Sequence, residues 1–120
     1  LSFTTALFSQ ETVSKYDEKL AKSLNADERG MKKYVFCLLK TGSNTTATKE
    51  ESQKLFEGHM DNIGRLAKEG KLVLAGPFMK NDRNYRGIYI FNASTIEEAK
   101  EFVATDPAVQ SNLLEAELTL

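Results

Sequence analysis

Apolar positions recur along this chain at two spacings, which separate the predicted strands from the predicted helices. Residues 33–40 contain an aromatic and β-branched apolar run that is typical of a strand. Shorter apolar runs predict strands at residues 71–75 and 87–91. At residues 114–120, leucine or alanine alternates with glutamate or threonine, a period of two that predicts a half-exposed strand.

Two helices are predicted between these strands, and a capping box marks the start of each. In this motif a Ser or Thr and a Glu three residues later each accept a hydrogen bond from the other residue's backbone N–H. Thr48–Glu51 starts the first helix, whose apolar stripe runs to a glycine stop at Gly70. Ser94–Glu97 starts the second helix, and Asp106-Pro107 ends it.

The predicted connections define the fold class. Gly76-Pro77 is expected to end the second strand, because proline cannot donate to a strand ladder. Residues 80–84 form a polar turn into the third strand. The resulting order, β-α-β-β-α-β, is the split-βαβ plan, in which right-handed crossovers put both helices on one face of a four-stranded antiparallel sheet. The sequence therefore predicts an α+β, ferredoxin-like domain.

Both faces of the predicted sheet are apolar. The first strand alternates between two apolar sides, carrying Tyr34, Phe36 and Leu38 on one and Val35, Cys37 and Leu39 on the other. Two helices cover one face, so the other needs a second layer. A second copy of the same sheet would supply it and give a two-fold homodimer. Folding back of an N-terminal helix is the alternative cover.

Residues 1–30 are predicted to be an extension of the domain at residues 31–120. An amphipathic helix is expected at residues 11–24, where apolar residues recur at spacings of three and four, with Gly30 as a later stop. Residues 1–10 are apolar and rich in small residues, as in the tail of a secretory signal. That interpretation predicts a periplasmic or otherwise exported protein, and an ordinary N-terminal arm on a cytoplasmic protein is the alternative.

The net charge, the length of the apolar runs and the single cysteine and histidine argue against several classes of function. The chain has 120 residues, enough for one core, and a net charge of −1, which gives no basic surface for nucleic acid. No apolar run approaches the ~18 residues of a membrane span. The single cysteine, Cys37, lies in an apolar run and is expected to be a buried, inert thiol. The single histidine, His59, cannot form a metal cluster alone.

His59 and Asp106 are the candidate catalytic residues. His59 lies on or beside the core-facing stripe of the first helix, and the antiparallel arrangement of the helices brings Asp106 near the N-terminal half of that helix. A carboxylate there would fix the imidazole tautomer and leave the other ring nitrogen free for acid–base work. The alternative is a partly buried structural histidine, with Asp106 capping the turn before Pro107.

Other candidates have weaker local support. Arg65 and Arg86 could bind an anionic substrate, or pair with acidic neighbours on the surface. Tyr85 and Tyr89 could line a pocket, although aromatic residues on strands usually belong to the core. Gly76 has no phosphate-loop context, so no nucleotide site is predicted.

Several motifs resemble those of the YCII-related proteins over about residues 31–120. They are His59, Glu69–Leu72, Ala75–Pro77, Ser94–Ala99 and Asp106-Pro107. The Gly-Pro after the second strand and the Asp-Pro after the second helix are the specific parts. Residues 26–34 and 58–87 also resemble an exported subgroup from Gram-negative bacteria.

The resemblance implies a dimeric α+β barrel with one cleft per subunit and a His–Asp pair inside it. In this chain that pair is His59 and Asp106, with Gly76 and Pro77 beside the substrate. Most family members have no established reaction, one branch dehydrochlorinates a chlorinated hydroxyhydroquinone, and muconolactone isomerases share the fold. The expected function is a small cofactor-free enzyme that eliminates or isomerises a small cyclic or aromatic substrate. A non-catalytic ligand-binding module and a structural dimer are the alternatives.

Overall fold

The computed structural model describes residue 2 and residues 15–120. The chain divides into two compact units, Leu1–Lys32 and Lys33–Leu120. In the first unit, helix α1 (Glu18–Ser23) begins after Asp17, whose side chain accepts a hydrogen bond from the Leu20 backbone N–H. Of the helix predicted at residues 11–24, the described residues 15–17 are not helical, because a side-chain cap forms at residue 17. Residues 11–14 of that prediction lie outside the described residues.

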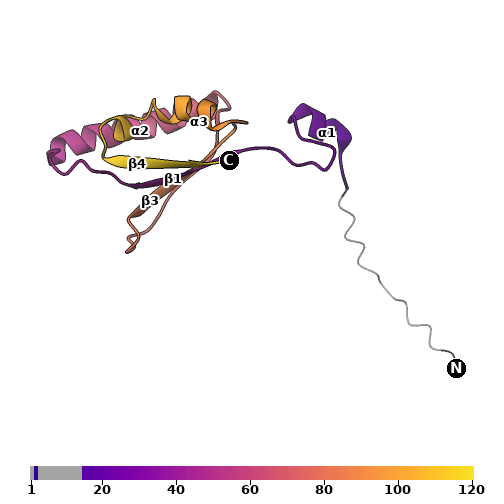
Figure 1. Cartoon of the computed structure of the whole chain (residues 1–120), viewed down its shortest axis with the longest axis horizontal. Coiled ribbons are helices and arrows are strands. Elements are labelled where there is room, and N and C mark those ends of the chain that lie inside the picture. The colour runs from indigo at the N-terminus through magenta and orange to yellow at the C-terminus, as the bar shows by residue number, and fades with distance from the viewer. Residues whose placement is uncertain (1, 3–14) are drawn as a thin grey trace. The chain divides into compact units, whose positions relative to one another are not determined.

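The second unit is a four-stranded antiparallel sheet with its helices on one face, as Figure 1 shows. Its elements are β1 (Val35–Thr41), α2 (Lys49–Lys68), β2 (Leu72–Pro77), β3 (Tyr85–Phe91), α3 (Ile96–Val103), α4 (Pro107–Gln110) and β4 (Leu114–Thr119). The strand order is β2-β3-β1-β4, with every neighbouring pair antiparallel. This confirms the predicted α+β, ferredoxin-like fold class.

The helix starts differ from the sequence prediction in one case. Thr48 and Glu51 form the predicted capping box at α2. At α3 the N-cap is Thr95, not Ser94, and its hydroxyl accepts from the Glu98 N–H. The Thr95–Glu98 pair, one residue further along, caps the helix in the same way as the predicted Ser94–Glu97 pair would. The local sequence pattern alone does not distinguish between the two pairs.

Strand β2 also runs further than predicted. It continues through Gly76 and Pro77, which pair with Ile88 and Gly87 of β3. Because β2 is an edge strand and Pro77 is its last residue, the missing proline N–H costs no hydrogen bond within the sheet. The Gly-Pro pair is therefore part of the sheet edge, not a break before it.

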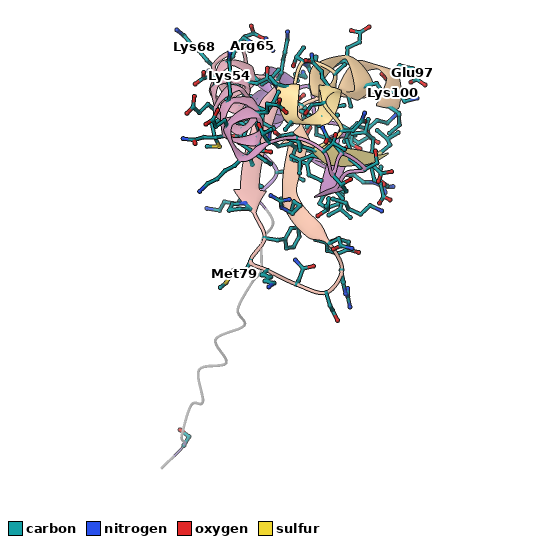
Figure 2. All side chains as sticks on the ribbon, turned by 90° about the vertical axis from the view of Figure 1, so that its left-hand side faces the viewer. Lys54, Arg65, Lys68, Met79, Glu97 and Lys100 are labelled. Carbon is teal, nitrogen blue, oxygen red and sulfur yellow. The ribbon has the colours of Figure 1, made fainter. Side chains whose placement is uncertain are left out.

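The core lies between the sheet and the helices. Val35, Cys37 and Leu39 of β1 point to this side and are buried with Tyr89 and Phe91 of β3. The charged residues of the helices lie on the outer side of the helical layer, away from the sheet; Figure 2 labels Lys54, Arg65, Lys68, Glu97 and Lys100. No helix among the described residues is long and apolar enough to cross a membrane.

The opposite face of the sheet has no covering layer in the second unit. Phe36 of β1 is 40% exposed and pairs with Ile90 of β3, and the half-buried residues Leu38 and Ile88 form the next pair along. Leu74 of β2 extends the same apolar surface beside Ile90. This surface is the open face. Its apolar width supports the expectation of a second layer.

We propose that a second copy of the chain covers the open face. Sedimentation at micromolar concentration should then give about twice the 13.4 kDa chain mass, from an interface on the order of 2,000 Å². Phe36→Lys should shift the protein to monomer, because it places a charge in the centre of the apolar contact. Met60→Lys, on the helical layer, is the matched control and should leave the mass doubled. A parent protein that sediments as a monomer contradicts the proposal.

Candidate functional site

His59 reaches the sheet from α2. It shares a helix face with Phe56, Met60 and Ile63, at spacings of three and four residues that bring side chains onto one side. Its side chain is 12% exposed, and its ring meets Phe56 edge-on at 5.8 Å between centroids. The imidazole therefore sits between the helix and the sheet with one side open.

Asp106 joins α3 to α4 and is completely buried. One carboxylate oxygen, Oδ1, accepts the Ala108 backbone N–H at 2.9 Å and so caps α4. The other, Oδ2, lies 2.8 Å from Nδ1 of His59. The structure thus brings the two predicted residues together, and the capping role and the histidine contact occur at the same time on different oxygens.

A glycine in α2 permits this approach. Gly58 lies under Pro107, and a Cβ at Gly58 would stand 3.0 Å from the proline Cγ. Such a contact is tighter than ordinary packing, so a Cβ at this position would require the proline ring to shift by a few tenths of an ångström. Asp106 immediately precedes that proline. The absence of a side chain at Gly58 therefore lets the start of α4 pack closely on α2 beside His59.

Tyr89 of β3 is the third member of the site. Its hydroxyl donates to Oδ2 of Asp106 at 2.8 Å and lies 3.2 Å from Nδ1 of His59. Burial, followed by the Asp106 charge and hydrogen bond, raises the pKa of Tyr89 far above its ordinary value, so the phenol stays a donor. Sequence reasoning left Tyr89 as either a pocket-lining or a core residue, and in the structure it is both buried in the core and part of the cleft lining. The feature of the sequence that could have identified it is a tyrosine, with a hydroxyl that needs a partner, at an inward-facing strand position between Gly87 and Phe91, which are both buried.

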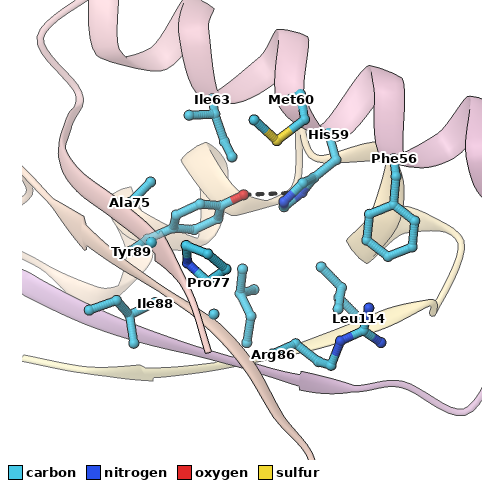
Figure 3. A pocket seen from close by; sticks show the side chains of 13 residues that line it. Phe56, His59, Met60, Ile63, Ala75, Pro77, Arg86, Ile88, Tyr89 and Leu114 are labelled. Atoms are coloured by element: carbon cyan, nitrogen blue, oxygen red, sulfur yellow. Dashed lines mark hydrogen bonds between the residues drawn. The ribbon is translucent and has the colours of Figure 1, made fainter. Parts of the chain in front are cut away.

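The surroundings of His59 select one tautomer. A buried carboxylate only accepts, so Nδ1 carries a hydrogen that it donates to Asp106. The other ring nitrogen, Nε2, then bears the lone pair in the neutral ring. Nε2 has no hydrogen-bond partner within residues 15–120, and the ring is directed into a cleft (Figure 3).

The cleft lies between α2 and the sheet and has a volume of about 340 Å³. Its lining residues are mostly apolar: Leu39, Phe56, His59, Met60, Ile63, Ala75, Gly76, Pro77, Arg86, Gly87, Ile88, Tyr89 and Leu114. The predicted substrate residues Gly76 and Pro77 are in this set, on the edge strand β2. The volume suits one small ring-shaped molecule.

Arg86 reaches the cleft because of a β-bulge. Leu39 pairs with Gly87 and Lys40 pairs with Tyr85, so Arg86 is an extra residue on β3. A bulge bends the strand and redirects the side chain at that point. The guanidinium lies over the Phe56 ring on the helical side, 5.6 Å from its centroid.

Arg65 does not join the cleft. Its guanidinium donates to Oδ1 of Asn62 at 2.7 Å and to the Glu69 carboxylate at 3.0 Å along α2. Figure 2 shows it on the outer surface of the helical layer. Of the two predicted anion-binding arginines, Arg86 is the one that lines the cleft. Tyr85 also lies elsewhere, with its ring 5.6 Å from that of Phe78.

Two further observations limit the chemistry available at the site. Burial, with a smaller contribution from the Asp106 charge, raises the pKa of the Cys37 thiol to about 12, so it is a poor nucleophile. Within the described part of the chain, no three His, Cys, Asp or Glu side chains gather in a way that could hold a metal ion. The group available for acid–base chemistry in the cleft is therefore the Nε2 atom of His59.

Known proteins share this fold. The chain matches the YCII-related domain over residues 34–118. It is 34% identical over 76 residues to the uncharacterized protein YjpA of Bacillus subtilis (strain 168), across 63% of this chain and 84% of YjpA. A solved structure, 5-chloro-2-hydroxyhydroquinone dehydrochlorinase (TftG) from Burkholderia phenoliruptrix AC1100 in complex with 2,5-dihydroxybenzoquinone, has a TM-score of 0.50 at 17% identity. That likeness covers 72% of this chain and 91% of TftG, and at such identity it shows the fold alone.

Removing the Tyr89 hydroxyl should destabilise the domain. Tyr89→Phe deletes one of three hydrogen-bond donors to the buried Asp106 carboxylate. We expect it to lower the free energy of unfolding, measured by urea titration, by about 1–2 kcal/mol. Tyr85→Phe is the matched control on the same strand and should change it by less than ~0.5 kcal/mol. Equal effects of the two substitutions would contradict the assigned hydrogen bond.

The Cys37 thiol should resist modification in the native protein. At pH 8, iodoacetamide should label it slowly in buffer and rapidly in urea. Because its pKa rises from 9.0 to about 12 on folding, the native state keeps a proton that the unfolded chain loses between these values. Stability relative to Cys37→Ala should therefore fall above pH 9 by about 1.4 kcal/mol per pH unit. If the difference in unfolding free energy between the parent and Cys37→Ala stays constant from pH 8 to 11, the raised pKa of Cys37 is contradicted.

Proposed function

The chain belongs to the YCII-related family, and we propose that it is a small acid–base enzyme that works by proton transfer without a cofactor. One observation carries the proposal. His59 presents an unpartnered Nε2 to an apolar cleft while its Nδ1 is held by a fully buried carboxylate. That arrangement is suited to a general base that later acts as a general acid.

The buried carboxylate would assist in two ways. Asp106 fixes which nitrogen of His59 carries the hydrogen, so the lone pair always faces the cleft. When Nε2 takes a proton, the imidazolium forms beside a negative charge that stabilises it. Tyr89 and the Ala108 N–H hold the carboxylate in place, so little reorganisation accompanies the transfer.

Elimination and isomerisation both fit such a site. In an elimination, Nε2 of His59 takes a proton from a substrate carbon, and the electron pair of that C–H bond forms a double bond. The leaving group departs from the neighbouring carbon with its own electron pair. In an isomerisation, Nε2 returns the proton to a different carbon. Neither reaction needs an oxidant or a reductant, and apolar walls strengthen the electrostatic assistance by excluding water.

The substrate class follows from the size of the cleft and from the structural neighbour. A volume of about 340 Å³ with mostly apolar lining suits a small cyclic or aromatic molecule. TftG is a dehydrochlorinase whose structure holds 2,5-dihydroxybenzoquinone, which supports the same substrate size and a related reaction. The second candidate function is ligand binding without catalysis, which the same cleft favours.

A proton-exchange assay tests the proposal. The ring C–H positions of 2,5-dihydroxybenzoquinone exchange with D₂O through proton transfer alone, and loss of the ring-proton NMR signal reports the rate. The parent should accelerate exchange over buffer. His59→Ala should reduce the acceleration by ~10²–10⁴, because the imidazole that accepts the substrate proton is gone. Asp106→Asn should have a smaller effect, since the imidazole remains but its tautomer is no longer fixed.

The controls separate chemistry from folding. Glu57→Ala, an exposed change on the same helix, should leave the rate unchanged. Circular dichroism and urea titration establish that His59→Ala is folded. A folded His59→Ala protein that exchanges as fast as the parent contradicts the proposal. A parent that binds the quinone without accelerating exchange favours the binding function.

A further inference from the structure

Arg86 is a charged side chain without a charged partner. It forms no ion pair or side-chain hydrogen bond with any residue in the described part of the chain, and its guanidinium lies over the Phe56 ring. The residue lines the cleft and is exposed to solvent. No Asp or Glu is among the described residues that line the cleft. The carboxylate of the site, Asp106, is buried behind His59 and accepts its hydrogen bond. Arginine at a cleft usually pairs with an anion, because its planar fork matches a carboxylate or other oxyanion.

The bulge on β3 places this charge. In a regular ladder, residue 86 would pair with Lys40 and share its face, on the side away from the helices. The register instead pairs Lys40 with Tyr85 and leaves Arg86 as the extra residue. Bulges of this kind often occur beside functional sites, where they redirect a side chain. The cation is therefore carried into the cleft by a backbone irregularity that the core does not require.

Phe56 sets the position of the charge relative to His59. The imidazole centroid and the guanidinium carbon lie 5.8 and 5.6 Å from the centre of the same ring. The Phe56 ring is not an acceptor for the guanidinium N–H groups in a cation–π contact, and no side chain in the described part of the chain accepts a hydrogen bond from them, so these donors can bind a ligand. Both groups line the same cleft, so a ligand bound there lies beside them.

We propose that Arg86 binds an anionic oxygen of the substrate, so that the cleft takes small planar ring molecules that carry a negative charge. The inference rests on the proposed function for the identity of the reacting group, and it adds the charge of the substrate. The anionic oxygen is a carboxylate or an ionised ring hydroxyl. Where the proton leaves a carbon next to a C–O group, the charge that develops on that oxygen also falls within reach of Arg86.

Matched ligand pairs test the charge preference without requiring turnover. Benzoate and benzamide have the same shape and differ in charge, and 4-nitrophenolate and 4-nitroaniline form a second pair that represents the ionised hydroxyl. Dissociation constants come from NMR titration of the full chain. The parent should bind the anion of at least one pair about tenfold more tightly, the scale of one charge-assisted hydrogen-bonded pair. The pair that shows the preference identifies the source of the anionic oxygen.

Variants assign the preference to Arg86. Arg86→Gln should remove it, with the neutral ligand binding as before. Arg86→Lys should keep part of it, because the charge remains and the planar fork is lost. Arg83→Gln, an exposed arginine in the turn before β3, is the matched control and should keep it in full.

The outcomes are separable from those for catalysis. His59→Gln should retain the anion preference even if it has lost proton exchange, so a catalytic failure leaves this inference standing. A parent with no preference in either pair overturns the inference. So does a preference that Arg86→Gln and Arg83→Gln keep equally, since the charge responsible then lies elsewhere.

Discussion

The carboxylate of Asp106 accepts hydrogen bonds from three separate parts of the domain while fully shielded from water. Its donors are His59 in α2, Tyr89 in β3 and the Ala108 N–H at the start of α4. An isolated buried charge costs several kcal/mol, so the carboxylate is tolerated only when all three elements are in place. One residue thus ties the helical layer to the sheet and at the same time fixes the orientation of the imidazole. Stability and site geometry depend on the same contacts.

The two faces of the sheet differ in what covers them within the second unit. The helical side holds the core and, at the end where β2 and β3 meet α2, opens into the cleft. The core ends there because Gly76, Pro77 and Gly87 carry no large side chains to fill the space. The open face remains apolar without cover in its own unit. A fold of this size can therefore carry a binding site on one side and an association surface on the other without conflict between them.

The cleft combines few polar groups with an apolar wall, which gives each polar group a large effect. His59 and Arg86 flank Phe56. The His59 side chain is 12% exposed whereas Arg86 is an exposed residue, so solvent screens charge less at the histidine than at the arginine. Proton transfer and recognition of a negative charge are complementary in that setting, because removal of a proton creates the charge that the cation attracts. The proposed chemistry needs only these two groups and the carboxylate behind the histidine.

Local patterns in the sequence determined the elements, their order and the approach of His59 to Asp106. Capping at Thr48 and the period of two in the last strand depend on neighbours a few residues away, and the helix–sheet plan then follows from chain connectivity. The tertiary structure alone decided the rest. Tyr89 became a donor to Asp106, Arg86 turned into the cleft through a bulge, and β2 continued through Pro77 because it lies at the edge. Each of these depends on a partner strand or helix distant in sequence, and a pattern of neighbouring residues contains no information about that pairing.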